Sequence, residues 1–124
     1  MKSIAYGLCV VFLAVCLGGC TPSPDELRST GISEYQVGHH DRAQTMFQRV
    51  LDKYPCDADS LYYMGRIAHA QKEYVKAMYY YQAAIDADPG YAPAKHYLKE
   101  AEKEAGDLAG YLKYIPPQHD KILP

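Results

Sequence analysis

The sequence repeats itself at one fixed interval. When the chain is offset against itself so that Leu27 falls on Leu61, eight positions carry the same or a similar residue. The pairs are Leu27 with Leu61, Gly31 with Gly65, Ala43 with Ala77, Phe47 with Tyr81, Gln48 with Gln82, Leu51 with Ile85, Asp52 with Asp86, and Pro55 with Pro89. A fixed period of about 20 to 50 residues is typical of proteins in which one structural unit stacks on the next. The period therefore predicts a solenoid.

The repeated positions resemble the tetratricopeptide repeat (TPR), a pair of helices with a period of about 34 residues. The copy at 58–91 carries nearly the whole pattern: Leu61, Met64, Gly65, Ala68, Tyr74, Ala77, Tyr81, Ala84 and Pro89. The copy at 24–57 matches at Leu27, Gly31, Gly38, Ala43, Phe47, Val50 and Pro55. The resemblance implies an all-α fold, a short TPR-type α-solenoid of antiparallel helix pairs. The expected helices are 24–37, 41–54, 58–71, 74–87 and 92–105.

Each repeated residue type has a packing role. Small residues such as Gly65 and Ala77 let the two helices of one repeat approach closely. Phe47 and Tyr81 are expected to fill the space between the second helix of one repeat and the first helix of the next. Proline ends the second helix, because it lacks an amide donor and disfavours helix in the residue before it.

Local signals agree with these boundaries. Ser23 and Glu26 fit a capping box, with Pro24 at the first helical position. Gly38 can end the first helix in a left-handed conformation.

A third copy begins but is not completed. Residues 92–105 fit a first helix, with Tyr97, Leu98 and Ala101 on its apolar side, but Tyr111 falls where a small residue is needed. Residues 107–114 are expected to form one or two helical turns capped by Asp107. We therefore interpret 92–114 as a C-terminal capping element of a TPR domain at 24–114. Residues 115–124, with two consecutive prolines, are expected to be an extended tail.

The start of the chain has the pattern of a bacterial lipoprotein signal. Residues 1–19 combine a basic start with an apolar stretch that is too short to span a bilayer. Leu17-Gly18-Gly19-Cys20 resembles the lipobox, which implies cleavage before Cys20 and lipidation of its thiol. Residues 20–23 would then be the lipidated cysteine and a short linker. In enterobacteria-like sorting, Thr21 in place of Asp favours the outer membrane, facing the periplasm.

The four cysteines do not form a disulfide framework in this interpretation. Cys9 and Cys16 leave with the signal, Cys20 carries lipid, and Cys56 remains as a single thiol. We expect Cys56 to be partly buried in a turn rather than to form an intermolecular bridge.

The first helices of TPR units line a concave face, and the resemblance places the candidate protein-binding groove there. Aromatic residues with Arg and His are favoured at protein interfaces, although part of this set could instead pack against itself. Tyr62 and Arg66, one turn apart, are the first choice. The full set is Arg28, Ile32, Tyr35, Gln36, Asp59, Tyr62, Tyr63, Arg66, His69, His96, Glu100 and Lys103.

Two sharper interpretations are disfavoured. A carboxylate clamp of the chaperone-binding type needs Asn, which the chain lacks, and Arg28 and Ile32 stand at two clamp positions. A stacking platform for sugar or nucleic acid in the run Tyr79-Tyr80-Tyr81 is also disfavoured, because aromatic residues at helical spacing more often belong to a core. Only Tyr81 has a required core position. Tyr79 and Tyr80 are expected on the outer surface, where they would mark a protein contact.

Catalysis and nucleic-acid binding find no support in the sequence. The net charge of −2 gives no basic excess, and no nucleophile, phosphate-loop or HExxH motif occurs. We expect no catalytic residue, metal or cofactor.

These features predict a lipid-anchored adaptor that binds a protein or peptide partner in the cell envelope and helps to assemble or localise an envelope complex. Its architecture resembles lipoproteins of pilus, secretion and outer-membrane assembly systems. The alternatives are a structural lipoprotein that forms homo-oligomers and, with less support, a module that binds cell-wall carbohydrate through its tyrosines.

Overall fold

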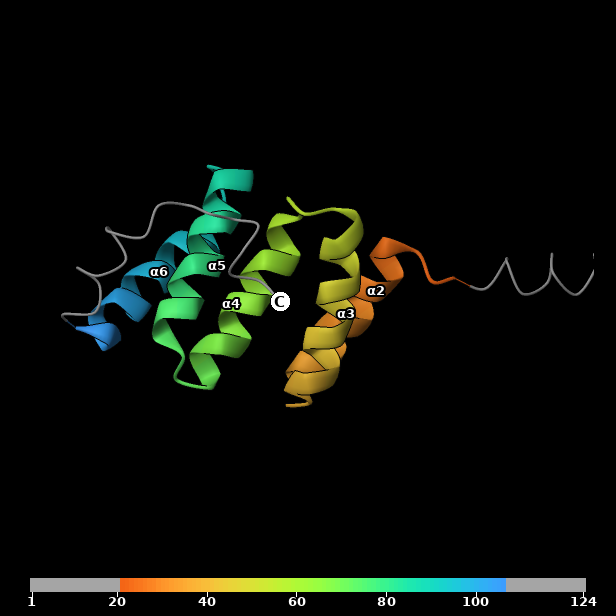
Figure 1. The fold of residues 1–124 in the computed structure, drawn as a ribbon, viewed down its shortest axis with the longest axis horizontal. Helices are drawn as coiled ribbons and strands as arrows, with labels where there is room; N and C mark the ends of the chain where they lie inside the picture. The colour runs from red at the N-terminus through yellow and green to blue at the C-terminus, as the bar shows by residue number, and fades with distance from the viewer. Residues whose placement is uncertain (1–20, 107–124) are drawn as a thin grey trace, which may run out of the picture.

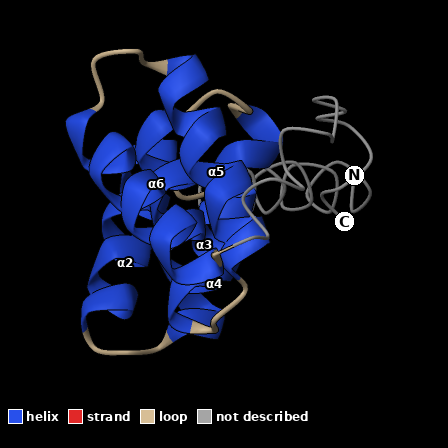
Figure 2. Ribbon diagram, turned by 90° about the vertical axis from the view of Figure 1, so that its left-hand side faces the viewer, coloured by secondary structure: helices blue, strands red, loops and turns tan. Residues whose placement is uncertain are grey.

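Five helices follow one another in the computed structural model, which describes residues 21–106. They are α2 (Pro24–Gln36), α3 (His40–Lys53), α4 (Ala58–Ala70), α5 (Tyr74–Ala87) and α6 (Ala92–Ala105). Each agrees with its predicted span to within one residue at either end. The described residues contain no strand (Figure 2). The predicted all-α solenoid is confirmed: α2 pairs with α3 and α4 with α5, and α6 packs on α5 (Figure 1).

Several predictions concern residues outside this range: the signal at 1–19, lipidation of Cys20, the turns at 107–114 and the tail at 115–124. None of the helices in residues 21–106 is long and apolar enough to cross a membrane.

The two helices of each repeat meet where a ring packs against a glycine. A Cβ atom added at Gly31 would lie 2.9 Å from the ring of Phe47, and one added at Gly65 would lie 2.6 Å from the ring of Tyr81. Both rings are fully buried. The predicted role of small residues in this close approach is confirmed in both repeats.

The same two rings also join one repeat to the next. Phe47 of α3 stacks on Tyr63 of α4, with ring centroids 5.2 Å apart and an interplanar angle of 6°. Tyr81 of α5 meets Tyr97 of α6 at 6.1 Å. The predicted bridging role of Phe47 and Tyr81 is therefore confirmed.

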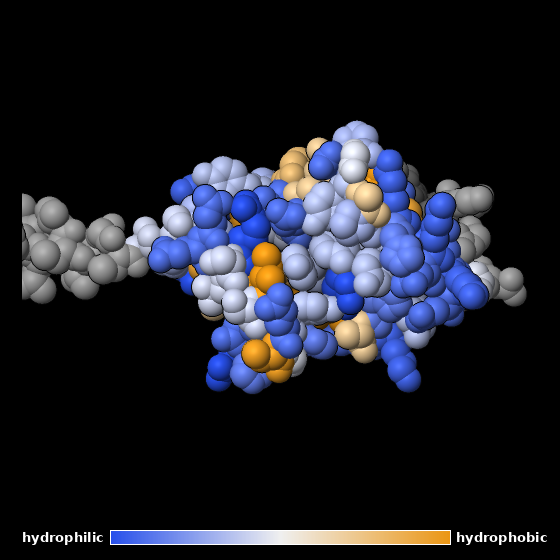
Figure 3. Space-filling view, turned by 180° about the vertical axis from the view of Figure 1, so that it is seen from behind, coloured by the Kyte–Doolittle hydropathy of each residue, from blue (hydrophilic) through white to orange (hydrophobic). Residues whose placement is uncertain are grey.

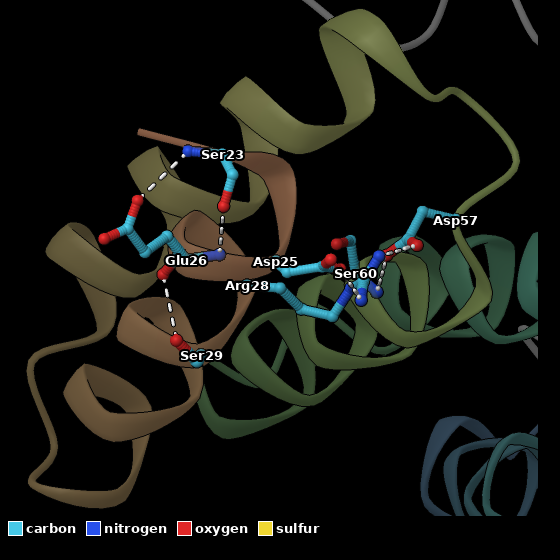
Figure 4. Close-up of polar contacts among 7 residues, drawn as sticks. All are labelled: Ser23, Asp25, Glu26, Arg28, Ser29, Asp57 and Ser60. Atoms are coloured by element: carbon cyan, nitrogen blue, oxygen red, sulfur yellow. Dashed lines mark hydrogen bonds and ion pairs between the residues drawn. The ribbon is translucent and has the colours of Figure 1, made fainter. Parts of the chain in front are cut away.

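The predicted helix caps are also present. The Ser23 hydroxyl accepts a hydrogen bond from the Glu26 amide at 3.2 Å, and the Glu26 carboxylate accepts one from the Ser23 amide at 3.2 Å (Figure 4). Gly38 adopts a φ of +86° just beyond α2, a conformation that suits glycine. The structure also shows a cap that was not predicted from the sequence: at the start of α4, the Asp57 carboxylate accepts a hydrogen bond from the Ser60 amide.

Helix α6 is the last helix of residues 21–106, and it carries charge where the two repeats carry apolar or small residues. In the two repeats, positions 27 and 61 hold leucine and positions 31 and 65 hold glycine, and all four residues are buried against the rest of their repeat. The equivalent residues of α6 are Lys95 and Lys99, both exposed. Charged side chains at these positions give α6 the polar outer side that a terminal solenoid element needs.

Two surface predictions are wrong. Tyr80 is only 2% exposed and belongs to the buried hydrophobic core. Cys56 is exposed, because the turn between α3 and α4, from Tyr54 to Cys56, lies wholly at the surface.

We predict that Gly65→Ala destabilises the protein, although alanine favours a helix over glycine. The added Cβ meets the buried Tyr81 ring, and overpacking of this kind costs about 1–3 kcal/mol. Urea unfolding followed by circular dichroism measures the loss. Gly90→Ala, in an exposed turn, is the matched control and should change the free energy of unfolding by less than about 0.5 kcal/mol. Equal effects of the two substitutions would contradict the steric explanation.

Candidate protein-binding groove

Helices α2, α4 and α6, the first helices of their units, follow one another across one side of the solenoid. In Figure 1 α2 and α6 pass behind α3 and α5, so Figure 3 shows the side on which α2 and α6 lie in front. Most of this face is hydrophilic, and its apolar areas are small and separate (Figure 3). The candidate groove is therefore a mixed surface, not an apolar patch.

Arg66 of α4 lies at the centre of this face and contacts helices on both sides. Its guanidinium carbon is 3.9 Å from the ring centroid of Tyr97 on α6 and 5.7 Å from that of Tyr35 on α2. It also donates a hydrogen bond of 2.8 Å to the Tyr62 hydroxyl. A cation placed over a ring contributes about 0.5–2 kcal/mol, depending on its desolvation. Arg66 thus connects all three first helices.

The rings around Arg66 also contact one another. Tyr63 makes edge contacts with Tyr35 and Tyr62, with centroids 5.4 and 5.1 Å apart, and Tyr62 lies 5.9 Å from Tyr97. We call these five residues the groove cluster: Tyr35, Tyr62, Tyr63, Arg66 and Tyr97. Burial raises the pKa of Tyr62, although the hydrogen bond from Arg66 opposes the shift. The hydroxyl therefore stays protonated near neutral pH.

At one end of the groove, Arg28 joins α2 to the start of α4. Its guanidinium donates to both carboxylate oxygens of Asp57, at 3.1 and 2.6 Å, and to Asp25 at 2.9 Å (Figure 4). Burial alone would raise the pKa of Asp57, but hydrogen bonds from Ser60 and Arg28 outweigh it and hold the pKa below its usual value. Arg28 is thus engaged in holding two repeats together.

At the next junction, Tyr91 before α6 donates a hydrogen bond of 2.5 Å to Asp59 of α4. Burial and this carboxylate raise the pKa of Tyr91. His69 lies 3.2 Å from the Tyr81 hydroxyl through one ring nitrogen and 3.2 Å from the Glu104 carboxylate through the other. Asp59 and His69 therefore connect α4 to the α5–α6 unit.

The predicted groove residues fall into three groups. The structure brings Tyr35, Tyr62, Tyr63 and Arg66 together in the cluster, but Tyr62 is only 8% exposed, so Arg66 offers more surface to a partner. A second group connects helices, as described above: Arg28, Asp59 and His69. Half-buried Ile32 packs against the core. The remaining four lie exposed at the rim: Gln36, His96, Glu100 and Lys103.

Sequence reasoning missed two members of this surface, Tyr91 and Tyr97. The period could have found Tyr97, because it lies one repeat after Tyr63 and occupies the same position in its helix. Tyr91 likewise lies one repeat after the cap Asp57, but a tyrosine there gives no sequence signal of a hydrogen bond.

Among residues 21–106, no group of three or more His, Cys, Asp or Glu side chains is placed to hold a metal ion. Several polar groups of this face bind one another: Arg28 with Asp57, Asp59 with Tyr91, and Arg66 with Tyr62.

We predict that Asp57→Ala destabilises the protein by about 1–3 kcal/mol, because it removes a helix cap and leaves Arg28 without its main partner. The low pKa of Asp57 means that its carboxylate stabilises the fold above the unfolded-state pKa of about 3.9. That contribution is lost as the pH falls through the folded-state pKa. Urea unfolding between pH 3 and pH 7 should therefore show the two proteins converging below about pH 4.

Asp25→Asn is the control for this prediction, because the Asp25 side chain is 87% exposed and contributes only a surface ion pair to Arg28. A stability difference between Asp57→Ala and the wild type that is independent of pH would contradict the role of the carboxylate charge.

The sequence profile of the tetratricopeptide repeat family matches residues 29–92, from α2 to the first residue of α6. This span exceeds half of the 124 residues and includes the two close-packed glycines. No curated protein sequence matches the chain. Profile, period and helix packing agree that the chain belongs to the tetratricopeptide repeat family.

Proposed function

We propose that this protein is a lipid-anchored adaptor of the bacterial envelope, held at the outer membrane and facing the periplasm. It binds a segment of a partner protein along the groove and helps to assemble or localise an envelope complex of the pilus, secretion or outer-membrane assembly type. TPR units generally mediate protein–protein interactions. The observation that carries the proposal is the groove cluster, which spans α2, α4 and α6.

The cluster has the chemistry of an interface centre. Tyrosine and arginine are the residue types enriched at the energetic centres of interfaces. Here they are held by contacts with one another before a partner arrives, which lowers the entropy lost on binding. The exposed polar residues Gln36, His96, Glu100 and Lys103 on α2 and α6 add hydrogen-bonding groups, and a polar rim is typical of protein interfaces.

The charged positions of α6, the last helix of residues 21–106, disfavour homo-oligomerisation through that helix. Lys95 and Lys99 are exposed where an additional helix would otherwise pack, and a second copy would have to desolvate both charges.

The anchor rests on the lipobox-like sequence before Cys20. Several acyl chains, each contributing about 0.8 kcal/mol per buried CH₂, hold a protein stably on a bilayer, whereas a single chain does not.

We predict that Arg66→Met reduces recovery of the partner at least about tenfold when the tagged protein is purified from envelope extracts. Methionine preserves much of the packing on Tyr97 but removes the charge and the hydrogen bond to Tyr62, and loss of a central interface contact of about 1.4 kcal/mol corresponds to that factor. Quantitative mass spectrometry of the recovered proteins gives the ratio.

Arg42→Met is the matched control, because the Arg42 side chain is 70% exposed and lies on α3, outside the groove. Circular dichroism checks that both variants fold. Undiminished recovery with folded Arg66→Met would rule out the groove as the binding site.

We predict that Cys20→Ser abolishes incorporation of labelled palmitate and leaves the precursor uncleaved, because the thiol is the acceptor of the lipid. Labelling in cells and electrophoretic mobility measure both effects, and Cys56→Ser should behave as the wild type. Palmitate labelling that persists in Cys20→Ser would refute the lipid anchor.

A further inference from the structure

A surface hollow lies on the face opposite the groove, between α3 and α5. The two helices are on the viewer's side in Figure 1, and no Cα atom of one comes within 8 Å of a Cα atom of the other. The hollow has a volume of about 310 Å³. It is lined by Gln44, Thr45, Gln48, Arg49, Lys76 and Tyr80.

The charge of this hollow is one-sided. Arg49 and Lys76 are its charged residues, and none of the lining residues is acidic. Within residues 21–106, Arg49 has no carboxylate within ion-pair distance. Lys76 pairs at 3.1 Å with Glu73 on its own helix, but both side chains are more than 40% exposed. Such an exposed pair contributes little and exchanges readily, so both cations are accessible to an incoming anion.

The other lining groups suit a peptide rather than a bare ion. Tyr80 lines the hollow from α5 and is otherwise buried. Burial raises the pKa of Tyr80 to about 12, so its hydroxyl is neutral near pH 7. Gln44 and Gln48 carry amides that can bond to a peptide backbone, although the Gln48 amide already donates to Asp52 at 2.9 Å. Aromatic, amide and cationic groups are thus combined in one place.

We infer that this hollow is a second docking site, which takes an acidic side chain from an extended segment of a partner protein. The carboxylate contacts Arg49 and Lys76, and the methylene groups of the side chain pack beside Tyr80. The volume lies at the low end of the roughly 300–1,000 Å³ of ligand sites, so it accommodates one or two residues. Charge complementarity selects Asp or Glu.

This site lies on a different face from the groove cluster and does not depend on the groove proposal. An adaptor with both sites can hold two protein segments at once, one on each face of the helix stack.

The test is a titration of the ¹⁵N-labelled full chain in detergent micelles with N-acetyl tetra-glutamate amide, followed by NMR. We expect saturable shifts of the amides around Arg49 and Lys76, with a dissociation constant of about 1 mM for so short a peptide. Arg49→Gln and Lys76→Gln should each weaken binding about tenfold, whereas Arg42→Gln, on α3 outside the hollow, should leave it unchanged.

Three outcomes would overturn the inference. Equal shifts with N-acetyl tetra-glutamine amide would show that the carboxylates do not matter. Equal binding of inorganic phosphate at the same concentration would identify a small-anion site instead of a peptide site. If Arg42→Gln weakened binding as much as Arg49→Gln does, the binding would depend on the overall charge of the surface and not on the hollow.

Discussion

The close approach of an aromatic ring to a glycine is the contact on which this structure depends. It occurs once in each repeat, between Gly31 and Phe47 and between Gly65 and Tyr81. The glycine sets the spacing of the two helices, and the ring, held against it, reaches the first helix of the next unit. One side chain thus determines both the geometry within a repeat and the position of the following repeat. A larger residue at either glycine would disturb both at once.

The groove follows from that positioning. Tyr63 and Tyr97 lie where they do because Phe47 and Tyr81 pack against them, and Arg66 then fills the space between the tyrosines of three helices. The same residues therefore hold the helices together and form the surface proposed to bind a partner. The separate links from Arg28 to Asp57 and from Tyr91 to Asp59 hold the repeats together at one end of the groove.

The repeat period predicted the helices and the glycine contacts, because backbone spacing and residue size recur with it. The period did not predict which residues of the groove face contact one another. Tyr62 is buried and Arg28 is paired because residues of neighbouring repeats surround them, and such contacts are not periodic. The buried position of Tyr80 was also missed, because Tyr80 packs into the hydrophobic core although it is not one of the repeated core positions. Cys56 was misplaced because turn residues carry no periodic signal of burial.

The start of α2 at Pro24 limits how far the domain could lie from a lipid on Cys20. Only three residues, Thr21 to Ser23, separate this helix from the cysteine proposed to carry lipid, and an extended residue spans at most about 3.6 Å. The first turn of the solenoid would then lie within about 15 Å of the bilayer surface. A linker of that length would let the domain pivot but would not let it reach across the periplasm. A partner would therefore have to reach the membrane surface in order to bind.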